Sequence, residues 1–456
     1  MIRFSVLYFA VLIMSCHSDR SDINRIPNVL FILADDLGSA ELGCYGGVDI
    51  LTPNIDQLAK EGMIFTQAYS GSAVCAPARS TLMTGLHTGH TYVRGNTGGI
   101  ALPDSVVTMA EVFQAAGYKT GGFGKWGLGE LGTEGVPERQ GFNEFVGYYH
   151  QIHAHNYFPD YLYENSNRLG LSNTDASQAY SAYTILDRTK SFIEANKDNQ
   201  FFCYAGYTLP HGDFVIPDDD PSVGMYADKD WLEDRKIYAA MVGLLDRQVG
   251  ALIQTLKDLE LYDNTLIVFC SDNGGLEQFA SYKPNGELRG FKRDMYEGGL
   301  RVPMIVKWSN RTPKGSTCNM PVYFPDMLPT FAEVIRAKDH LPKKLDGISL
   351  VNWLKNPALD HRNRYLYWEY PHYDWTDKRY DDTKFKQAFR TRNWKMIKNG
   401  KDKAWEFYNL DADPYEKDDM EAYHPGKMQK FQKWIKENRV SIAQVEPERV
   451  GGKPYR

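Results

Sequence analysis

The chain has 456 residues, of which 43% are hydrophobic and 24% are charged, and its formal net charge is −6 at pH 7. This is an ordinary composition for a globular protein with a large core and one to three domains. The net charge argues against a global basic field for nucleic acid or anionic lipid, although a local basic pocket for a small anion remains compatible with it.

Residues 1–16, MIRFSVLYFAVLIMSC, have the layout of a secretory signal. A basic residue precedes the apolar run Phe4–Met14, which is too short to span a bilayer. The run ends in LIMSC, which resembles the lipobox of bacterial lipoproteins and would make Cys16 the lipidated first mature residue. A plain signal peptide with a chance cysteine is the alternative. We expect residues 17–26 to form a polar tether, and the protein to reach the periplasm or the outer membrane of a Gram-negative bacterium, with no membrane contact other than this anchor.

Apolar runs alternate with amphipathic stretches along residues 27–360, which we expect to form one domain. The sequence predicts buried strands at 28–36, 200–211, 265–275 and 302–308, a glycine-rich strand or loop at 121–126, and helices at 52–62, 104–120, 187–196 and 233–261. Such alternation is typical of a large, mostly parallel sheet that is sandwiched by helices.

The pattern changes in residues 361–456. RYLYWEY, KQAFRTRNWKMIKN and AWEFYNL are closely spaced, rich in aromatic residues and more regularly alternating, and a helical stretch follows at 428–438. This predicts a smaller C-terminal subdomain, in which an antiparallel sheet packs against one helix. The predicted fold is therefore α/β with a small α+β unit at its end.

The chain has six cysteines: Cys16, Cys44, Cys75, Cys203, Cys270 and Cys318. If Cys16 carries lipid, five remain and at least one is unpaired within the chain. Cys203 and Cys270 lie in apolar runs and are predicted to be buried thiols of strands. For Cys75, in the segment CAPAR, three interpretations compete: a buried apolar thiol, half of a disulfide, or a reactive nucleophile.

Oxygen ligands follow two of the predicted strands. Asp35 and Asp36 come directly after VLFILA, and Asp272 and Asn273 follow LIVFCS. Ligands of open α/β sheets gather at the carboxyl ends of the strands, so these four side chains are candidates for one site. Three carboxylates and an amide form a hard-oxygen set that suits Ca²⁺ or Mg²⁺ better than Zn²⁺.

Cationic residues lie at similar places in the chain. Arg79, Lys125 in GFGKWG and Lys292 in LRGFKRDMYEGG belong to segments near glycines, where a backbone can approach a ligand closely. His211, in TLPHGDF, follows another buried strand. Each of these residues alone is also compatible with an ordinary surface charge or a structural histidine.

Five motifs in order make the resemblance specific. CAPAR matches the C-x-P-x-R signature of the type I sulfatases of the alkaline phosphatase-like superfamily, whose cysteine is oxidised to formylglycine by a maturation enzyme. NVLFILADDLG, GKWGLG, CSDNGG and LRGFKRDMYEGGLRVP also match, in family order, so that the resemblance covers nearly the whole mature chain. It implies that Cys75 is the precursor of a catalytic aldehyde.

The resemblance also implies roles for the other candidates. Asp35, Asp36, Asp272 and Asn273 would hold one Ca²⁺ together with the hydrated side chain at position 75. Arg79 would orient that hydrate, Lys125 and Lys292 would hold sulfate oxygens, and His211 would protonate the leaving alcohol. One hydroxyl of the hydrate attacks sulfur, and the other lets the adduct collapse and release sulfate, an exit that a serine or a thiol lacks.

One position departs from the family pattern. Many relatives have G-K-W-H-L-G, with the histidine as the expected base, whereas this chain has Gly127 there. The segment YYHQIHAHNYFPDY offers His150, His153 and His155, of which we favour His153 or His155 as a replacement base or substrate contact. A loop whose histidines bind backbone is the structural alternative. Arg94 and Asn96, in GHTYVRGN, are further candidates for contacts with sugar hydroxyls.

Export and aromatic richness favour a sulfated carbohydrate as the substrate, cleaved at chain ends in a buried pocket, with galactose-type sulfates as the first expectation. Two rivals remain. A phosphate or phosphonate monoester hydrolase shares the plan of metal and nucleophile. A glycan-binding protein would keep the pocket but leave Cys75 unmodified.

Overall fold

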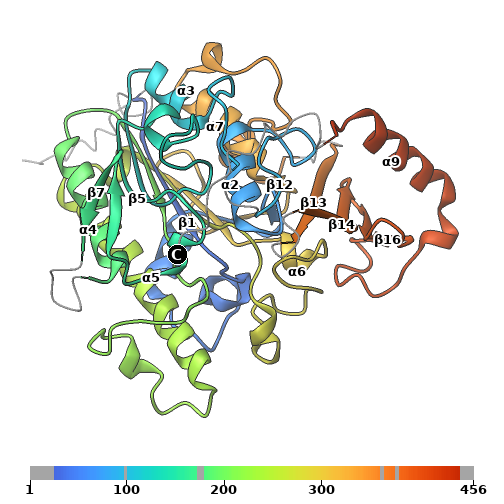
Figure 1. The fold of residues 1–456 in the computed structure, drawn as a ribbon, viewed down its shortest axis with the longest axis horizontal. Helices are drawn as coiled ribbons and strands as arrows, with labels where there is room; N and C mark the ends of the chain where they lie inside the picture. The colour runs from blue at the N-terminus through green and yellow to red at the C-terminus, as the bar shows by residue number, and fades with distance from the viewer. Residues whose placement is uncertain (1–24, 97–99, 172–178, 360–363, 375–378, 442–456) are drawn as a thin grey trace, which may run out of the picture.

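A large sheet and a small sheet organise the molecule (Figure 1). The computed structural model describes residues 25–96, 100–171, 179–359, 364–374 and 379–441. The predicted signal segment, Cys16 and most of the predicted tether lie outside the described residues. The boundary between the two predicted domains, at residue 360, falls in a segment that is also outside them and stays a prediction.

The large sheet has ten strands in the order β11-β2-β10-β9-β1-β8-β4-β5-β6-β7. Its five central strands, β9, β1, β8, β4 and β5, are parallel neighbours, as predicted. β10, β6 and β7 pair antiparallel with their neighbours, so the apolar run at 302–308 forms a strand, but one of opposite direction. The bounds are β1 Asn28–Ala34, β2 Met63–Phe65, β4 Lys119–Lys125, β5 Glu144–Tyr148, β6 Tyr161–Glu164, β7 Asn167–Gly170, β8 Phe201–Gly206, β9 Thr265–Ser271, β10 Met304–Trp308 and β11 Ser316–Cys318.

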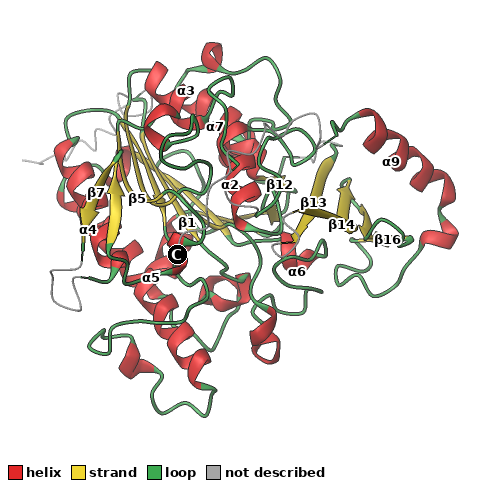
Figure 2. Cartoon of the chain, in the orientation of Figure 1, coloured by secondary structure: helices red, strands yellow, loops and turns green. Residues whose placement is uncertain are grey.

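Helices cover both faces of the large sheet, which explains why β1, β8 and β9 are buried at every position (Figure 2). Within β1, Val29, Phe31 and Leu33 pack into one core, and Leu30, Ile32 and Ala34 into the other. The first core includes helices α2 (Cys75–Thr84), α3 (Met109–Ala115), α7 (Met327–Val334) and α8 (Val351–Lys355), and the second includes α1 (Pro53–Glu61), α4 (Ser181–Ala195) and α5 (Glu233–Asp258).

The predicted helix at 104–120 is only partly correct. α3 begins after Thr108, whose hydroxyl accepts a hydrogen bond from the backbone of Glu111 while the Glu111 carboxylate accepts one from the backbone of Thr108. It ends before Gly117, and Lys119 already belongs to β4. The glycine-rich segment at 121–126 is therefore mostly strand.

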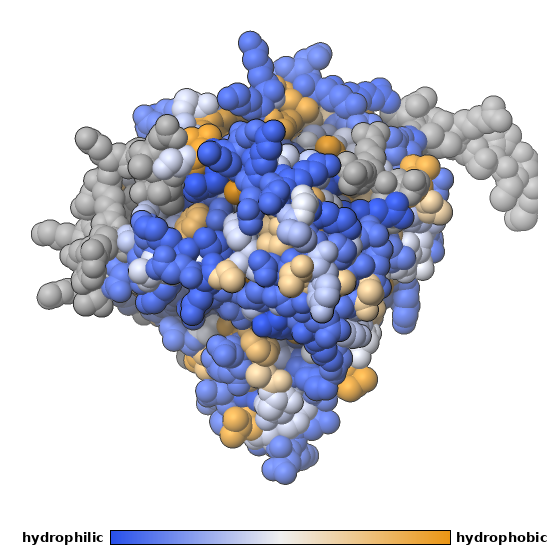
Figure 3. Space-filling view, turned by 90° about the vertical axis from the view of Figure 1, so that its right-hand side faces the viewer, coloured by the Kyte–Doolittle hydropathy of each residue, from blue (hydrophilic) through white to orange (hydrophobic). Residues whose placement is uncertain are grey.

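The small sheet packs between the large domain and a terminal helix. β13 (Leu366–Asp374), β14 (Arg379–Arg390), β15 (Trp394–Asn399) and β16 (Trp405–Asn409) form an antiparallel sheet, as predicted. Trp368 and Ile397 on one face contact the short segments around Tyr69 and α6 (Glu297–Leu300), whereas Phe389 and Phe407 on the other lie under α9 (Pro425–Glu437). The side of the molecule formed by this unit is mainly hydrophilic, with scattered hydrophobic spots (Figure 3).

The cysteines of the described residues are all free: Cys44, Cys75, Cys203, Cys270 and Cys318. Cys203 and Cys270 are fully buried in β8 and β9, as expected for strand thiols. Among the described helices, none combines the length and the apolarity that a membrane crossing requires.

Candidate active site

Two neighbouring strand ends bring four polar side chains together. β1 and β9 are parallel, with Ala34 opposite Ser271, so the residues that follow them lie side by side. Asn273 Nδ2 donates to Asp36 Oδ1 at 2.8 Å, and the backbone N–H of Asp36 lies 3.3 Å from Asp272 Oδ1. Asp36 adopts a φ of 67°, a left-handed conformation that aspartate tolerates better than most residues. The predicted set of Asp35, Asp36, Asp272 and Asn273 is therefore one buried group.

Cys75 is the first residue of α2 and points at this group. Its thiol donates to Asp35 Oδ1 at 3.3 Å and the residue is 1% exposed. Burial, with the negative charge of Asp35, raises the pKa of the thiol to about 12. At neutral pH the sulfur is therefore protonated and a poor nucleophile. Because Cys75 is also free of any disulfide, the disulfide interpretation loses support.

Three buried cations surround the carboxylates. Arg79, one turn along α2, donates to Asp272 Oδ2 from Nε at 3.2 Å and from Nη2 at 3.0 Å. Lys125, the last residue of β4, places Nζ 2.5 Å from Asp35 Oδ2. Lys292 places Nζ 2.6 Å from Asp36 Oδ2. We call these three cations, the four strand-end residues, Cys75 and His211 the strand-end cluster.

The charges of the strand-end cluster shift one another's pKa values. Burial alone raises the pKa of Asp35, but the charges of Lys125, His211 and Arg79 outweigh it and hold this pKa well below its usual range. For Asp272, burial and the nearby charge of Asp35 prevail over Arg79 and raise the pKa to about 7. The three cations therefore do not fully offset the burial of the Asp272 carboxylate and its repulsion by Asp35.

The residues present fit a bound hard cation. Ligand atoms of Asp35, Asp36, Cys75 and His211 all lie within 4.8 Å of one another. Asn273 Oδ1 is buried and has no hydrogen-bond donor within the described part of the chain, which suits an oxygen that ligates a metal. Asp272 does not belong to the 4.8 Å group, and its Oδ2 accepts a hydrogen bond from Arg79.

His211 lies at the edge of the cluster. Its Nδ1 donates to the carbonyl oxygen of Gly212 at 3.1 Å, so Nε2, 3.5 Å from Asp36 Oδ2, faces the cluster. Burial, reinforced by Lys292, lowers its pKa. His211 and Lys292 are the cluster's least enclosed side chains, 11% and 8% exposed, and we place the approach for a substrate there.

The structure separates the two histidines that the sequence favoured as a replacement base. His155 stacks on His211, with ring centroids 4.3 Å apart and planes 22° from parallel. His153, two residues earlier in the same turn, packs instead against Tyr148 and Tyr161, with centroid distances of 4.9 and 4.8 Å. Burial is the main cause that lowers the pKa of His155 to about 3 and of His153 to about 4. Only His155 is therefore brought to the cluster.

Arg94 and Asn96 also differ in position. Arg94 is fully buried, and its guanidinium donates to Glu369 Oε1 at 2.9 Å and to the carbonyl oxygen of Gly89 at 3.0 Å. This geometry argues against the expected contact of Arg94 with substrate, because its donors are engaged inside the fold. Asn96 lies near the cluster, since its Oδ1 accepts a hydrogen bond from the backbone N–H of Ala76 at 2.9 Å.

Two neighbours of the cluster had not been predicted. Tyr204 in β8 accepts a hydrogen bond from Arg79 Nη1 at 3.1 Å. Gln151 lies against Gly127, where a Cβ atom would come within 1.9 Å of Gln151 Nε2. Gly127 has a φ of 80°, a backbone conformation that favours glycine. The Gln151 side chain fills the space that a histidine at position 127 would need. In the sequence Gln151 lies between His150 and His153. This position is the signal that could have marked it as a neighbour of the cluster.

Two family models match the chain. The first, described as Sulfatase, matches residues 27–337, and the second, described as N-sulphoglucosamine sulphohydrolase, C-terminal, matches residues 286–444. Together they span both sheets.

Relatives and solved structures agree with these matches. N-acetylgalactosamine-6-O-sulfatase of Bacteroides thetaiotaomicron is 26% identical, over 89% of this chain and 92% of that protein. Ulvan-active sulfatase of Formosa agariphila is 28% identical, over 92% and 83%. The crystal structure of Ps i-CgsB in complex with k-i-k-neocarrahexaose has 30% identity and a TM-score of 0.78, covering 91% of this chain and 94% of that one.

Proposed function

Because the chain belongs to the sulfatase family, a family of sulfuric ester hydrolases, we propose that it is an exported enzyme that removes sulfate from sugars at chain ends. It would do so with a formylglycine made from Cys75 and with one bound Ca²⁺. The observation that carries this proposal is the position of Cys75: a buried, protonated thiol among three carboxylates and three cations. A merely structural cysteine needs no such surroundings.

Each chemical part has residues that suit it. Asp35, Asp36, Asn273 and the side chain at position 75 would hold the Ca²⁺, with Asp272 nearby. Such an ion stabilises negative charge on sulfate oxygens, and a hydrated formylglycine supplies both the nucleophilic hydroxyl and the route by which sulfate leaves.

The protein's own cations then bind the anion. The amine of Lys125 pairs with Asp35, and the amine of Lys292 pairs with Asp36. Both amines would contact a sulfate that binds between them. Arg79 stays fixed by Asp272 and by the carbonyl oxygen of Lys125, so its role is to hold the start of α2 in place. Fixed charges of this kind are usually the largest contribution to catalysis.

His211 is suited to give a proton to the leaving alcohol. Its Nε2 faces the cluster from the side where exposure remains, the side at which a sugar would project. Since its pKa is lowered, the imidazole is neutral before the substrate binds, and the negative charge of a bound sulfate ester would favour its protonation. His155, stacked on it, restricts the rotation of the ring.

Sugar sulfates are the substrates that the relatives' names favour. One relative is named for N-acetylgalactosamine 6-sulfate and one for ulvan, and a structure of Ps i-CgsB, with 30% identity, was solved in complex with k-i-k-neocarrahexaose. The deep position of the cluster favours a terminal sulfated unit over the middle of a polymer. Galactose-type sulfates are the first class to test.

The test is sulfate release by protein that is co-expressed with a formylglycine-generating enzyme. The panel contains sulfated mono- and disaccharides of known linkage, with a phosphate monoester alongside and Cys75→Ala as the control. Release from one sugar position that depends on Cys75 is the expected result. Faster turnover of the phosphate monoester would make the chain a phosphate ester hydrolase, and tight sugar binding with unmodified Cys75 would make it a glycan-binding protein.

A further inference from the structure

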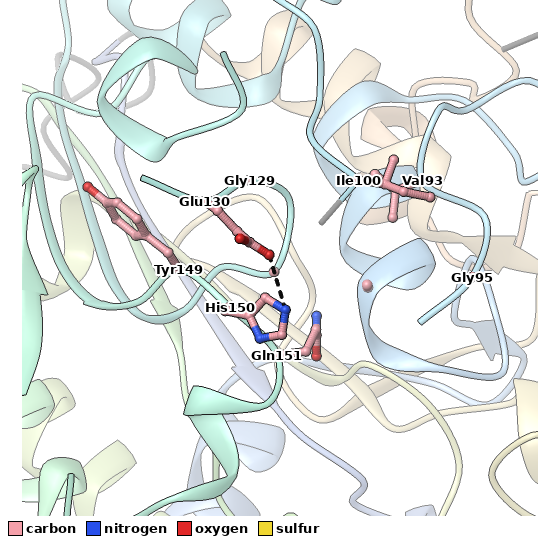
Figure 4. A pocket seen from close by; sticks show the side chains of 10 residues that line it. Val93, Gly95, Ile100, Gly129, Glu130, Tyr149, His150 and Gln151 are labelled. Carbon is pink, nitrogen blue, oxygen red and sulfur yellow. Dashed lines mark ion pairs between the residues drawn. The ribbon is translucent and has the colours of Figure 1, made fainter. Parts of the chain in front are cut away.

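A small cavity is lined in part by residues that follow members of the strand-end cluster in the chain. Its wall includes Ala76, which follows Cys75 at the start of α2, and Gly127, two residues after Lys125. Two of the cavity's lining residues therefore come within two positions after cluster members, Cys75 and Lys125. Figure 4 shows Gln151, with the ion pair of Glu130 and His150, on one side of this cavity and Val93, Gly95 and Ile100 on the other.

The amide of Gln151 is the unpaired polar group of this cavity. The residue is 7% exposed, and within the described part of the chain neither Nε2 nor Oε1 has a hydrogen-bond partner. A buried donor or acceptor without a partner costs about 1–3 kcal/mol. The neighbouring polar pair is already engaged: His150 Nε2 lies 3.1 Å from Glu130 Oε1, and His150 Nδ1 accepts from the backbone N–H of Ile152.

One water molecule meets the demands of this site. Gln151 requires a guest that both donates and accepts a hydrogen bond, and water does both. The cavity has a volume of about 10 Å³, close to the smallest space that holds one water and far too small for a sugar ring. Val93 and Ile100 offer the guest no competing polar contact.

The amide cannot replace an imidazole as a base. It occupies the space into which a side chain at position 127 would grow, but it keeps its N–H donors and its carbonyl acceptor at every pH and takes up no proton. Its contribution must therefore come from holding and orienting a small molecule, and Ala76, the residue after Cys75, lines the same cavity.

We propose that Gln151 is a positioning residue that holds one water molecule for addition to the aldehyde at position 75, a role that rests on the proposed formylglycine chemistry. The water oxygen bonds to the aldehyde carbon, the carbonyl electron pair moves to the carbonyl oxygen, and one water proton ends on that oxygen. The product is the dihydroxy side chain, and no other reactant is consumed. Gln151 Oε1 accepts one water hydrogen and Nε2 donates to the water oxygen.

The experiment compares the first turnover with later ones. Wild type, Gln151→Leu, Gln151→Glu and the matched control Gln248→Leu are matured in the same way; Gln248 is another buried glutamine, on α5, whose Nε2 donates to the carbonyl oxygen of Ala182. Rapid quenching gives the rates of the first and of later turnovers on the substrate identified by the panel. An aminooxy probe, added during turnover, traps free aldehyde, which mass spectrometry of the peptide containing residue 75 quantifies.

For Gln151→Leu we expect a first turnover within about twofold of wild type, a steady-state rate at least tenfold lower, and more trapped aldehyde, whereas Gln248→Leu leaves the ratio of the two rates unchanged. Gln151→Glu, which keeps an acceptor and loses the donor, should fall between them and serves if the leucine variant does not fold. Equal losses in both rates, or no loss, would overturn the role of Gln151. A wild type that shows no Cys75-dependent release would instead remove the proposed function itself.

Discussion

At the junction between the two sheets, Glu369 accepts hydrogen bonds from Arg94, Arg439 and Tyr367, at 2.9, 2.8 and 2.8 Å. At the ends of β1 and β9 the carboxylates are equally buried, yet no donor among the described residues reaches Asn273 Oδ1, and burial together with the charge of Asp35 raises the pKa of Asp272 to about 7. Burial of charge alone therefore does not identify a functional site. What distinguishes the second region is charge that the protein itself leaves incompletely matched.

The largest expected effect is that of Cys75→Ala. Turnover of sulfate esters should fall to background, because the side chain has a chemical role, while the midpoint of thermal unfolding changes little. Sulfate release and a thermal melt check this. Activity that survives the substitution would refute the assignment of Cys75.

His211→Ala should reduce turnover of sugar sulfates by about 10²–10⁴-fold, the usual contribution of a general acid. Aryl sulfates with good leaving groups should lose much less, because their departing oxygen needs no proton. The measurement is kcat on both substrate classes. Equal losses on both would exclude His211 as the acid.

Glu369→Gln should reduce stability and leave activity nearly unchanged, the opposite of what is expected for Cys75→Ala. Removing the charge between Arg94 and Arg439 leaves the buried cation of Arg94 unmatched and should lower the free energy of unfolding by about 3–5 kcal/mol. In the folded protein kcat/KM should stay within a few-fold of wild type. Urea denaturation and kinetics together test this. A loss of activity without a loss of stability would place the junction in the active site and break the comparison.

Lys292→Ala should cost about 10²–10³ in kcat, the effect of losing one fixed charge at a reacting anion. The free energy of unfolding should also fall, because buried Asp36 loses its paired amine, so kcat is measured on protein shown to be folded. Lys283→Ala, which removes an exposed lysine paired with Glu287, is the matched control and should keep full activity.

The smallest expected effect is that of metal removal on stability. At a Ca²⁺ concentration 100 times its Kd, binding adds about 2.7 kcal/mol to the free energy of unfolding, and chelation should remove that increment. Unfolding curves with and without chelator measure it, with Asn273→Leu as the variant that should respond least. An identical response of wild type and variant would argue against Asn273 as a ligand.

The strand-end cluster could be predicted from sequence, because the residues that follow neighbouring parallel strands lie at the same edge of the sheet, as Asp36 and Asn273 do. The engagement of Arg94 inside the fold could not be predicted, because its partner, Glu369, is 275 residues away. His153 and His155 diverge because a 3₁₀ turn of three residues sends them in different directions. The antiparallel direction of β10 and the contact between Gly127 and Gln151 depend on tertiary packing. A local sequence pattern does not predict either of them.

The burial of Cys75 also sets an order of events in time. A maturation enzyme needs the thiol within reach, but the finished fold exposes 1% of the residue, and Trp368 of β13 closes over the preceding segment by donating to the carbonyl oxygen of Ser70 at 2.8 Å. During synthesis β13 emerges almost three hundred residues after position 75. In the proposed maturation, oxidation of the cysteine would have to precede the completion of folding, and the late synthesis of the small sheet would lengthen the interval available for it.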